Sequence, residues 1–97
     1  MSAVTVRAAV RGCHVTTEGA DRAALHLTLK VDGCATGVMA ALPYKCVGAG
    51  WLAQRAAARM TAGRSVTVWC AGFGQDQDGR MRLFGVDHIS DCEGVPA

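Results

Sequence analysis

The sequence has few aromatic residues and no long hydrophobic run. Only five of its 97 residues are Phe, Trp or Tyr, so the core has to be built from smaller side chains. No apolar stretch approaches the roughly 20 residues that span a bilayer, and the N-terminal segment lacks the basic-then-apolar order of a signal peptide. We therefore expect a soluble, cytoplasmic protein that does not enter a membrane.

Recognisable catalytic and metal-binding patterns are also lacking. The five cysteines are an odd number, and no two of them form a C-x-x-C pair. The three histidines do not stand at ligand or triad spacing from a cysteine or carboxylate. No nucleophile elbow, phosphate loop or paired-carboxylate arrangement is found. We expect free thiols in a reducing compartment, no metal, no cofactor and no enzymatic activity.

The charge is weakly basic and unevenly distributed. The net charge is +2, with eight Lys or Arg against three Asp or Glu in residues 1–70, and two against five in residues 71–97. Eight of the ten cations are Arg, which stacks on bases and forms paired hydrogen bonds to phosphate. This composition permits nucleic-acid binding. The length suits one domain, 1–90, followed by a short polar tail, 91–97.

Hydrophobic periodicity predicts five strands and one helix. Alternating apolar residues indicate strands that end at Gly12 and at Asp32-Gly33. A third apolar run stops before Pro43, which lacks a backbone donor and so belongs at a strand end or a sheet edge. An apolar helical stripe then runs from Ala49 to the stop signal at Gly63. The predicted strands cover 4–11, 25–31, 38–42, 66–71 and 81–89, the helix covers 49–62, and Asp78-Gly79 is the turn of a hairpin. The order of strand, strand, strand, helix, strand, strand is that of the OB-fold, an all-β, five-stranded Greek-key barrel.

The second half of the chain resembles the end of the OB domain of bacterial single-stranded DNA-binding proteins. In that family a helix beginning Leu-Ala runs to a Gly, and a Val-rich strand, an acidic hairpin containing Gly and a basic-led strand follow. The matching features here are Leu52-Ala53, Gly63, Val66 to Val68, Asp76 to Gly79 and Arg82, within LAQRAAARMTAGRSVTVWCAGFGQDQDGRMRLFGVDHI at 52–89. The primosomal replication protein N branch, a dimeric relative, fits equally well.

The resemblance implies largely sequence-independent binding of single-stranded DNA, in replication, repair or maintenance of mobile elements. It also implies a homodimer or homotetramer, and a small Ala-rich barrel with unpaired strand edges agrees with self-association. The family's linker and acidic partner-binding tip have no counterpart before the chain stops at Pro96-Ala97. We therefore expect no recruitment of replication proteins through such a tail.

The chain departs from the family in its aromatic residues. Stacking on aromatic side chains contributes roughly 1–3 kcal/mol per base. The family's aromatic positions before the helix and in the hairpin correspond to Ala49 and Gly74, with Trp51 and Phe73 nearby but out of register. We expect Trp51 to pack against the end of the barrel. Trp69 alternates with apolar valines, so its indole either points outward or packs under the helix or in a subunit interface.

The candidate binding residues are cations and rings on outward strand faces or beside the hairpin. An OB ligand surface lies on the second and third strands and on two loops, between strands one and two and between strands four and five. The predicted nucleic-acid contacts are Arg7, Arg11, Lys30, Trp69, Phe73, Arg80, Arg82 and Phe84.

Two alternatives stay open. The small number of aromatics and the low net charge also fit an OB module that binds proteins and has lost nucleic-acid binding. RNA in the same groove is the other alternative, because stacking tolerates either sugar.

Overall fold

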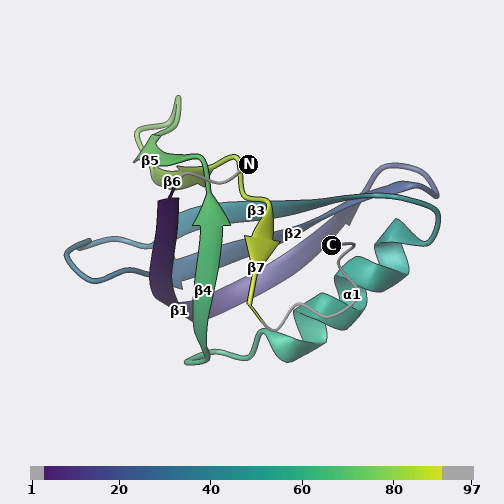
Figure 1. The fold of residues 1–97 in the computed structure, drawn as a ribbon, viewed down its shortest axis with the longest axis horizontal. Helices are drawn as coiled ribbons and strands as arrows, with labels where there is room; N and C mark the ends of the chain where they lie inside the picture. The colour runs from purple at the N-terminus through teal and green to yellow at the C-terminus, as the bar shows by residue number, and fades with distance from the viewer. Residues whose placement is uncertain (1–3, 91–97) are drawn as a thin grey trace.

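The computed structural model describes residues 4–90, so the predicted tail, 91–97, lies outside the described residues. Figure 1 labels the elements. The strands are β1 (Val4–Thr17), β2 (Arg22–Lys30), β3 (Val38–Lys45), β4 (Ser65–Cys70), β5 (Gly72–Gln75), β6 (Met81–Phe84) and β7 (His88–Ile89), and the helix is α1 (Ala49–Arg59).

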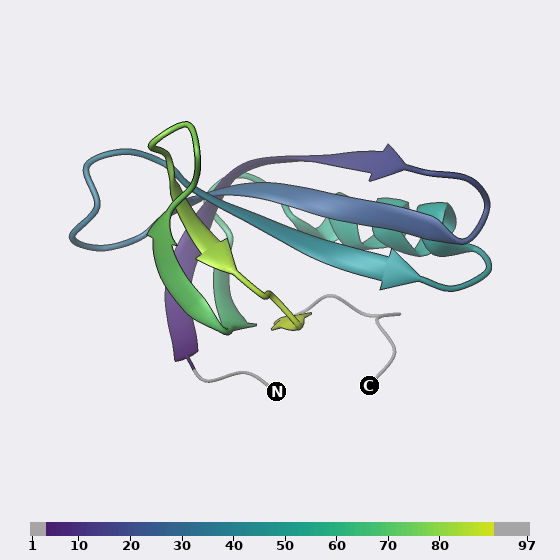
Figure 2. The same ribbon diagram turned by 90° about the horizontal axis from the view of Figure 1, so that it is seen from above.

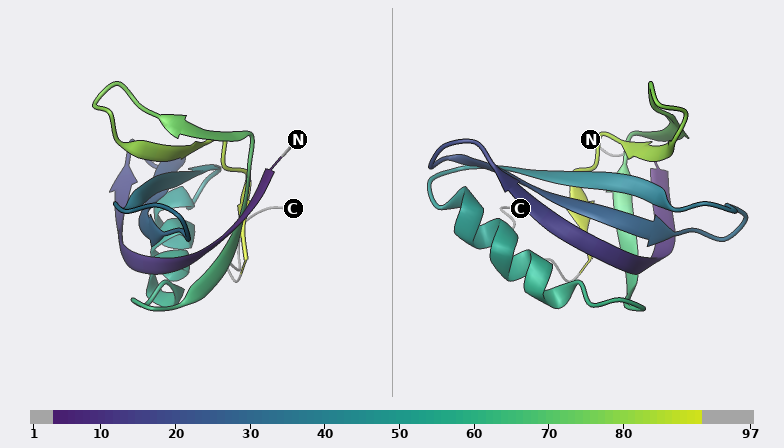
Figure 3. Two further views of the ribbon diagram at one scale, coloured as in Figure 1. Left: turned by 90° about the vertical axis from the view of Figure 1, so that its left-hand side faces the viewer. Right: turned by 180° about the vertical axis from the view of Figure 1, so that it is seen from behind.

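All seven strands belong to one strongly curled sheet, in the order β5-β6-β3-β2-β1-β4-β7. Every pair is antiparallel except β3 and β6, which run parallel. Figure 3 shows the curl most clearly, because β1 sweeps from the layer beside α1 into the layer formed with β4. A mostly-β fold with one helix between the third and fourth strands confirms the coarse prediction. The predicted number of five strands is wrong, since residues 4–90 form seven.

The two additional strands come from interruptions in the second half. Ala71 separates β4 from β5, and its backbone N–H donates to Phe84 O at 2.8 Å. The single strand expected over 81–89 is broken between Phe84 and His88, where Gly85 has a φ of +61°. The segment from Gly72 to Gln75, which lies outside the predicted strands, pairs with β6 and is a strand.

Two residues expected to end strands do not end them. The pairing of β1 with β2 shifts register between Val10 and Gly12, so Gly12 follows a β-bulge and the strand continues to Thr17. The strand β3 also continues through Pro43 to Lys45. Its other edge pairs with β6 only at Met39, so no strand requires a hydrogen bond from Pro43 on that side.

The helix covers one face of the sheet formed by β1, β2 and β3. Its buried residues are Ala49, Ala53 and Ala56, and their small side chains allow close approach to the strands. The helix ends at Arg59, earlier than predicted, with the N–H of Met60 bonded to Ala57 O at 3.0 Å. Figure 2 shows the opposite face of these strands free of any helix. The helix α1 has 11 residues, and no helix within 4–90 is long and apolar enough to cross a membrane.

Candidate nucleic-acid interface

The outer face of β1, β2, β3 and β6 carries a row of side chains between two arginines. The strand register places Thr28, Met39 and Arg82 side by side on three neighbouring strands. Thr28 Oγ1 lies 3.7 Å from Met39 Sδ, so the middle of the row is a compact, largely apolar floor. Arg11 occupies the bulge at the other end. Its Nη1 is 3.9 Å from where a Cβ on Gly37 would lie, so the guanidinium reaches across β2.

A histidine pair forms the next row of this face. The rings of His14 on β1 and His26 on β2 stack with centroids 4.7 Å apart and planes 10° apart. A 2.8 Å hydrogen bond joins His26 Nε2 to Thr16 Oγ1. Burial lowers the pKa of His26 from its ordinary 6.5, and the positive charges of His14 and Arg82 lower it further. At neutral pH the His26 ring is therefore uncharged, and the two stacked rings present a flat surface beside the row.

Phe84 adds an exposed ring on the side of Arg82. The two residues share a face of β6 because strand side chains alternate, and 41% of Phe84 is exposed. The opposing residues on β5 are Gly72 and Gly74. A Cβ on Gly74 would lie 3.4 Å from Phe84 Cε2, so glycine leaves this part of the ring uncovered.

The hairpin between β5 and β6 positions Arg82. Asp76 Oδ1 accepts backbone N–H groups from Asp78 at 2.9 Å and from Arg80 at 3.0 Å, and Asp76 Oδ2 lies 3.5 Å from Arg82 Nε. The bond from the Arg80 N–H is the largest of the interactions that lower the pKa of Asp76 below its usual 3.8. The Asp78-Gly79 turn is confirmed, and the Arg80 side chain lies exposed at this turn.

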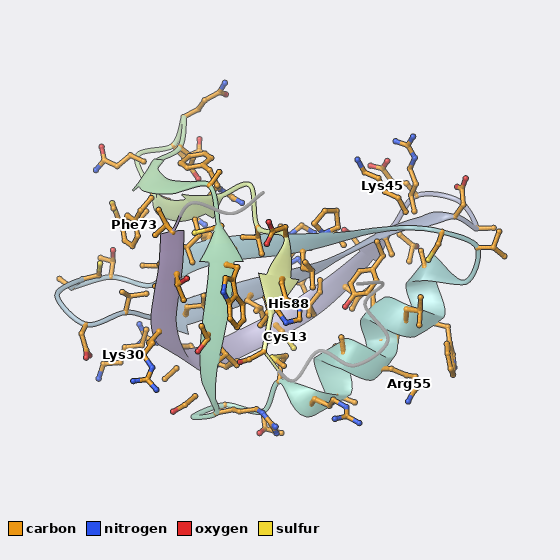
Figure 4. All side chains as sticks on the ribbon, in the orientation of Figure 1. Cys13, Lys30, Lys45, Arg55, Phe73 and His88 are labelled. Atoms are coloured by element: carbon orange, nitrogen blue, oxygen red, sulfur yellow. The ribbon has the colours of Figure 1, made fainter. Side chains whose placement is uncertain are left out.

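A second outer surface holds three other predicted contacts. Arg7 and Lys30 line one pocket at the bend of β1, and Trp69 lies two positions from the pocket residue Thr67 on the same face of β4. Trp69 is half-buried, and its ring centroid is 4.9 Å from that of its cross-strand neighbour His88. Figure 4 shows His88 beside β4, and Lys30 at the opposite end of the sheet from Lys45.

The eight predicted contacts therefore lie on more than one surface. Arg11, Arg82 and Phe84 share the face opposite α1, whereas Arg7 on β1 and Lys30 at the end of β2 line the pocket at the bend, with Trp69 beside it on β4. Phe73 belongs to neither group, because it pairs with buried Leu83 and points to the inner side of β5 with 39% exposed. The turn 18–21 is also distant from the hairpin, since Gly48 N–H bonds to Ala20 O beside the start of α1.

The expectation that Trp51 packs against the barrel is wrong. Its side chain is 63% exposed on α1, and the Arg55 guanidinium lies 4.8 Å from the ring centroid. Val47, two residues before the helix begins, is 89% exposed.

The histidine pair and Met39 are not among the residues predicted from the sequence. The pair follows from the β1–β2 turn, because Thr17 pairs with Ala23, and three residues before Thr17 and three residues after Ala23 His14 lies opposite His26. The prediction that the first strand ends at Gly12 left His14 outside the strand, so its pairing with His26 was not predicted.

Within residues 4–90 no three His, Cys, Asp or Glu side chains lie close enough to hold a metal ion. Comparison of the chain with protein-family models, with characterised proteins and with solved structures finds no match.

Proposed function

We propose that this protein binds single-stranded nucleic acid, single-stranded DNA in particular, across the outer face of β1, β2, β3 and β6. The observation that carries the proposal is the row in which Arg11 and Arg82 flank Thr28 and Met39, with the stacked histidines beside it. The arginines neutralise phosphates, and bases lie on the flat, uncharged surface between them.

The balance of charge on this face supports an anionic ligand. The Asp76 carboxylate lies beside the row, and it is already held by Arg82 and two backbone N–H groups. Arg11 has no ion-pair partner within residues 4–90. The apolar contact is provided by Met39 and by the ring of Phe84. Base stacking of this kind is tolerant of sequence, since every base has a π-face.

We also propose that this seven-stranded sheet has the topology of an OB barrel, in which two of that fold's five strands are each interrupted once. Only Ala71 separates β4 from β5, and Gly85 to Asp87 separate β6 from β7. With each pair counted as one strand, the neighbours run 1-2-3-5-4 and return to 1, with the helix between strands three and four. This connectivity supports a Greek-key barrel whose second and third strands form the ligand face.

The test is fluorescence anisotropy of labelled dT oligonucleotides of several lengths, at low and moderate salt, with duplex DNA and RNA as competitors. Two to four phosphate contacts predict a slope of log affinity against log salt of about −1.4 to −2.8. Preference for single strands and a slope in this range are the expected results. Absence of binding at low salt, or preference for duplex DNA, would contradict the proposal. The RNA competitor decides between the two sugars.

Arg11→Gln tests the face itself. The substitution is expected to weaken binding of every oligonucleotide and to make the slope shallower by about 0.7, the contribution of one phosphate contact. Arg55→Gln is the matched control, because Arg55 is exposed on α1 on the other side of the sheet. Equal losses of affinity in the two variants would mean that the interface does not lie on this face.

The alternative function, contact with proteins, has specific support in Trp51 and Val47. Large apolar side chains exposed to this degree at the start of one helix, with an Arg beside them, are typical of interaction surfaces. Sedimentation of the protein and of Trp51→Gln measures this role directly. An assembly that dissociates in Trp51→Gln, together with no oligonucleotide binding, would favour the alternative.

A further inference from the structure

We propose that the pocket at the bend of β1 binds a nucleoside phosphate, with Arg7 and Lys30 holding the phosphate and Trp69 stacking on the base. The pocket lies at the bend of β1, and none of Arg11, Thr28, Met39 and Arg82, which form the row, lines it. The inference therefore adds a second ligand surface and can be tested independently of the first.

The pocket exists because two strands diverge on either side of one small residue. Ala9 pairs with Lys30, the last residue of β2, and with Ser65, the first residue of β4. The adjoining loop is tied to this bend, since Val10 N–H donates to Arg64 O at 2.8 Å and Val10 O accepts from Gly63 N–H at 2.7 Å. The small side chain of Ala9 leaves the outer side of the bend hollow, and the longer side chains of Arg7 and Lys30 line the same hollow.

Its volume is about 560 Å³, which fits a ligand the size of a nucleotide better than an inorganic ion. The lining is mainly polar, with hydroxyl groups from Ser65, Thr67 and Ser90. Thr67 N–H donates to Ser90 Oγ at 2.8 Å, so the Ser90 hydroxyl is held in place with its own hydrogen still available to donate. Arginine, lysine and hydroxyl groups are the donors that phosphate oxygens accept.

The charges in the pocket favour one phosphate group. Arg7 and Lys30 are both exposed, and neither has a carboxylate within ion-pair distance in residues 4–90. Asp32 is the one carboxylate among the described residues that line the pocket. Two cations against one carboxylate attract a single anion, and Asp32 repels a second.

Trp69 supplies the position for the base. Along β4 it lies two residues beyond Thr67, about 6.6 Å away on the same face. The rows Arg7–Thr67 and Thr5–Trp69 follow one another on this face in the β1–β4 register, so Trp69 lies in the row next to the pocket residues Arg7 and Thr67. His88 contacts Trp69 from β7 with the rings tilted by 44°, which restrains the indole without the overlap of parallel rings.

The experiment uses Trp51→Phe protein, in which Trp69 is the remaining tryptophan, and follows its fluorescence. The probes are inorganic phosphate, thymidine, thymidine 5′-monophosphate, and dT oligonucleotides with and without a 5′-phosphate. Saturable quenching by the monophosphate, at least about tenfold tighter than by thymidine, is the expected result. Quenching by an oligonucleotide that requires its 5′-phosphate identifies a strand end as the source, whereas quenching by the monophosphate alone identifies a free nucleotide.

Arg7→Gln and Lys30→Gln are each expected to weaken the monophosphate about tenfold. The control is Lys45→Gln, which removes the other lysine, at the far end of the sheet. Thymidine that quenches as well as its monophosphate, equal effects of Lys30→Gln and Lys45→Gln, or no quenching by any probe would overturn the proposal. Arg11→Gln distinguishes the two surfaces, because it is expected to weaken oligonucleotides in the anisotropy assay and to leave the monophosphate unchanged.

Discussion

Gly85 and Ala71 face each other where the two bent strands turn, so closely that a Cβ on Gly85 would lie 2.8 Å from the Cβ of Ala71. Phe84, the residue before Gly85, also holds Ala71 in place, because the Ala71 N–H donates to Phe84 O at 2.8 Å. Gly85 has a φ of +61°, a conformation that other residues adopt at a cost of roughly 1–2 kcal/mol. The two strand interruptions therefore form one corner of the sheet, which admits no side chain at position 85.

Gly85→Ala is expected to destabilise the fold more than a positive φ alone would. Gly79→Ala is the control, since Gly79 has a φ of +77° but no atom within 4 Å of the position that a Cβ would take. We expect Gly79→Ala to reduce the free energy of unfolding by about 1–2 kcal/mol, and Gly85→Ala by at least about 1 kcal/mol more. Urea unfolding of both variants measures the difference.

Ala71→Gly separates the steric part of this effect from the conformational part. In the double variant Gly85→Ala with Ala71→Gly, the Cβ at 2.8 Å is absent and the nearest atom of residue 71 is its N at 3.6 Å. The double variant should regain the stability that the contact with the Ala71 Cβ costs Gly85→Ala, apart from the cost of the glycine introduced at position 71. A strictly additive loss in the double variant would mean that the two residues do not contact as described.

The Asp76 carboxylate is expected to make the hairpin sensitive to acid. Its pKa is lowered in the folded protein, first by the Arg80 N–H, so the unfolded chain takes up the proton at a higher pH. The stability it contributes is complete above its ordinary 3.8 and is lost as the pH falls through the lowered folded value. Asp76→Asn should therefore be less stable than the native protein at neutral pH and approach it in strong acid. Asp78→Asn is the control in the same turn, and equal pH profiles for the two variants would contradict this role.

The histidine pair predicts that oligonucleotide binding tightens as the pH falls. The pKa of His26 is below 6.5 in the free protein, chiefly through burial, and a nearby phosphate stabilises the protonated ring. Affinity should rise as the pH falls below neutrality through this lowered pKa, and His26→Gln should flatten the profile. His88→Gln, on the other surface, should retain it. For folding the sign is opposite, since the unfolded chain protonates first and stability decreases as the pH falls below 6.5.

The strands with regular alternation could be predicted from the sequence, and those containing glycine could not. Leu25, Leu27 and Leu29 have a strict period of two and lie buried in β2. Gly72 and Gly74 have no side chains that could show the apolar alternation of a strand. Their strand, β5, pairs with β6 through its backbone and leaves space for the Phe84 ring. A bulge and a strand end look alike in sequence, which is why the strand was expected to stop at Gly12.

The cations of the candidate surfaces could be predicted individually, but not their division between two faces. Arg7 and Arg11 stand on the same outward side of one strand by sequence alone. The bend of β1 beside Ala9 places them on different surfaces, and it depends on pairing with both β2 and β4. Such long-range pairing leaves no trace in the local pattern of β1.

Cys70 is expected to report global unfolding. It is fully buried in β4, and burial raises the pKa of its thiol, so both access and thiolate formation oppose reaction with a thiol reagent. Cys34, partly exposed in the β2–β3 loop, is the internal comparison. Opening the core requires most of the free energy of unfolding, so without denaturant Cys70 should be labelled roughly 10³-fold or more slowly than Cys34. Mass spectrometry of peptides after timed labelling measures both rates, and comparable rates would mean that β4 opens locally, which the pairing of β4 with both β1 and β7 opposes.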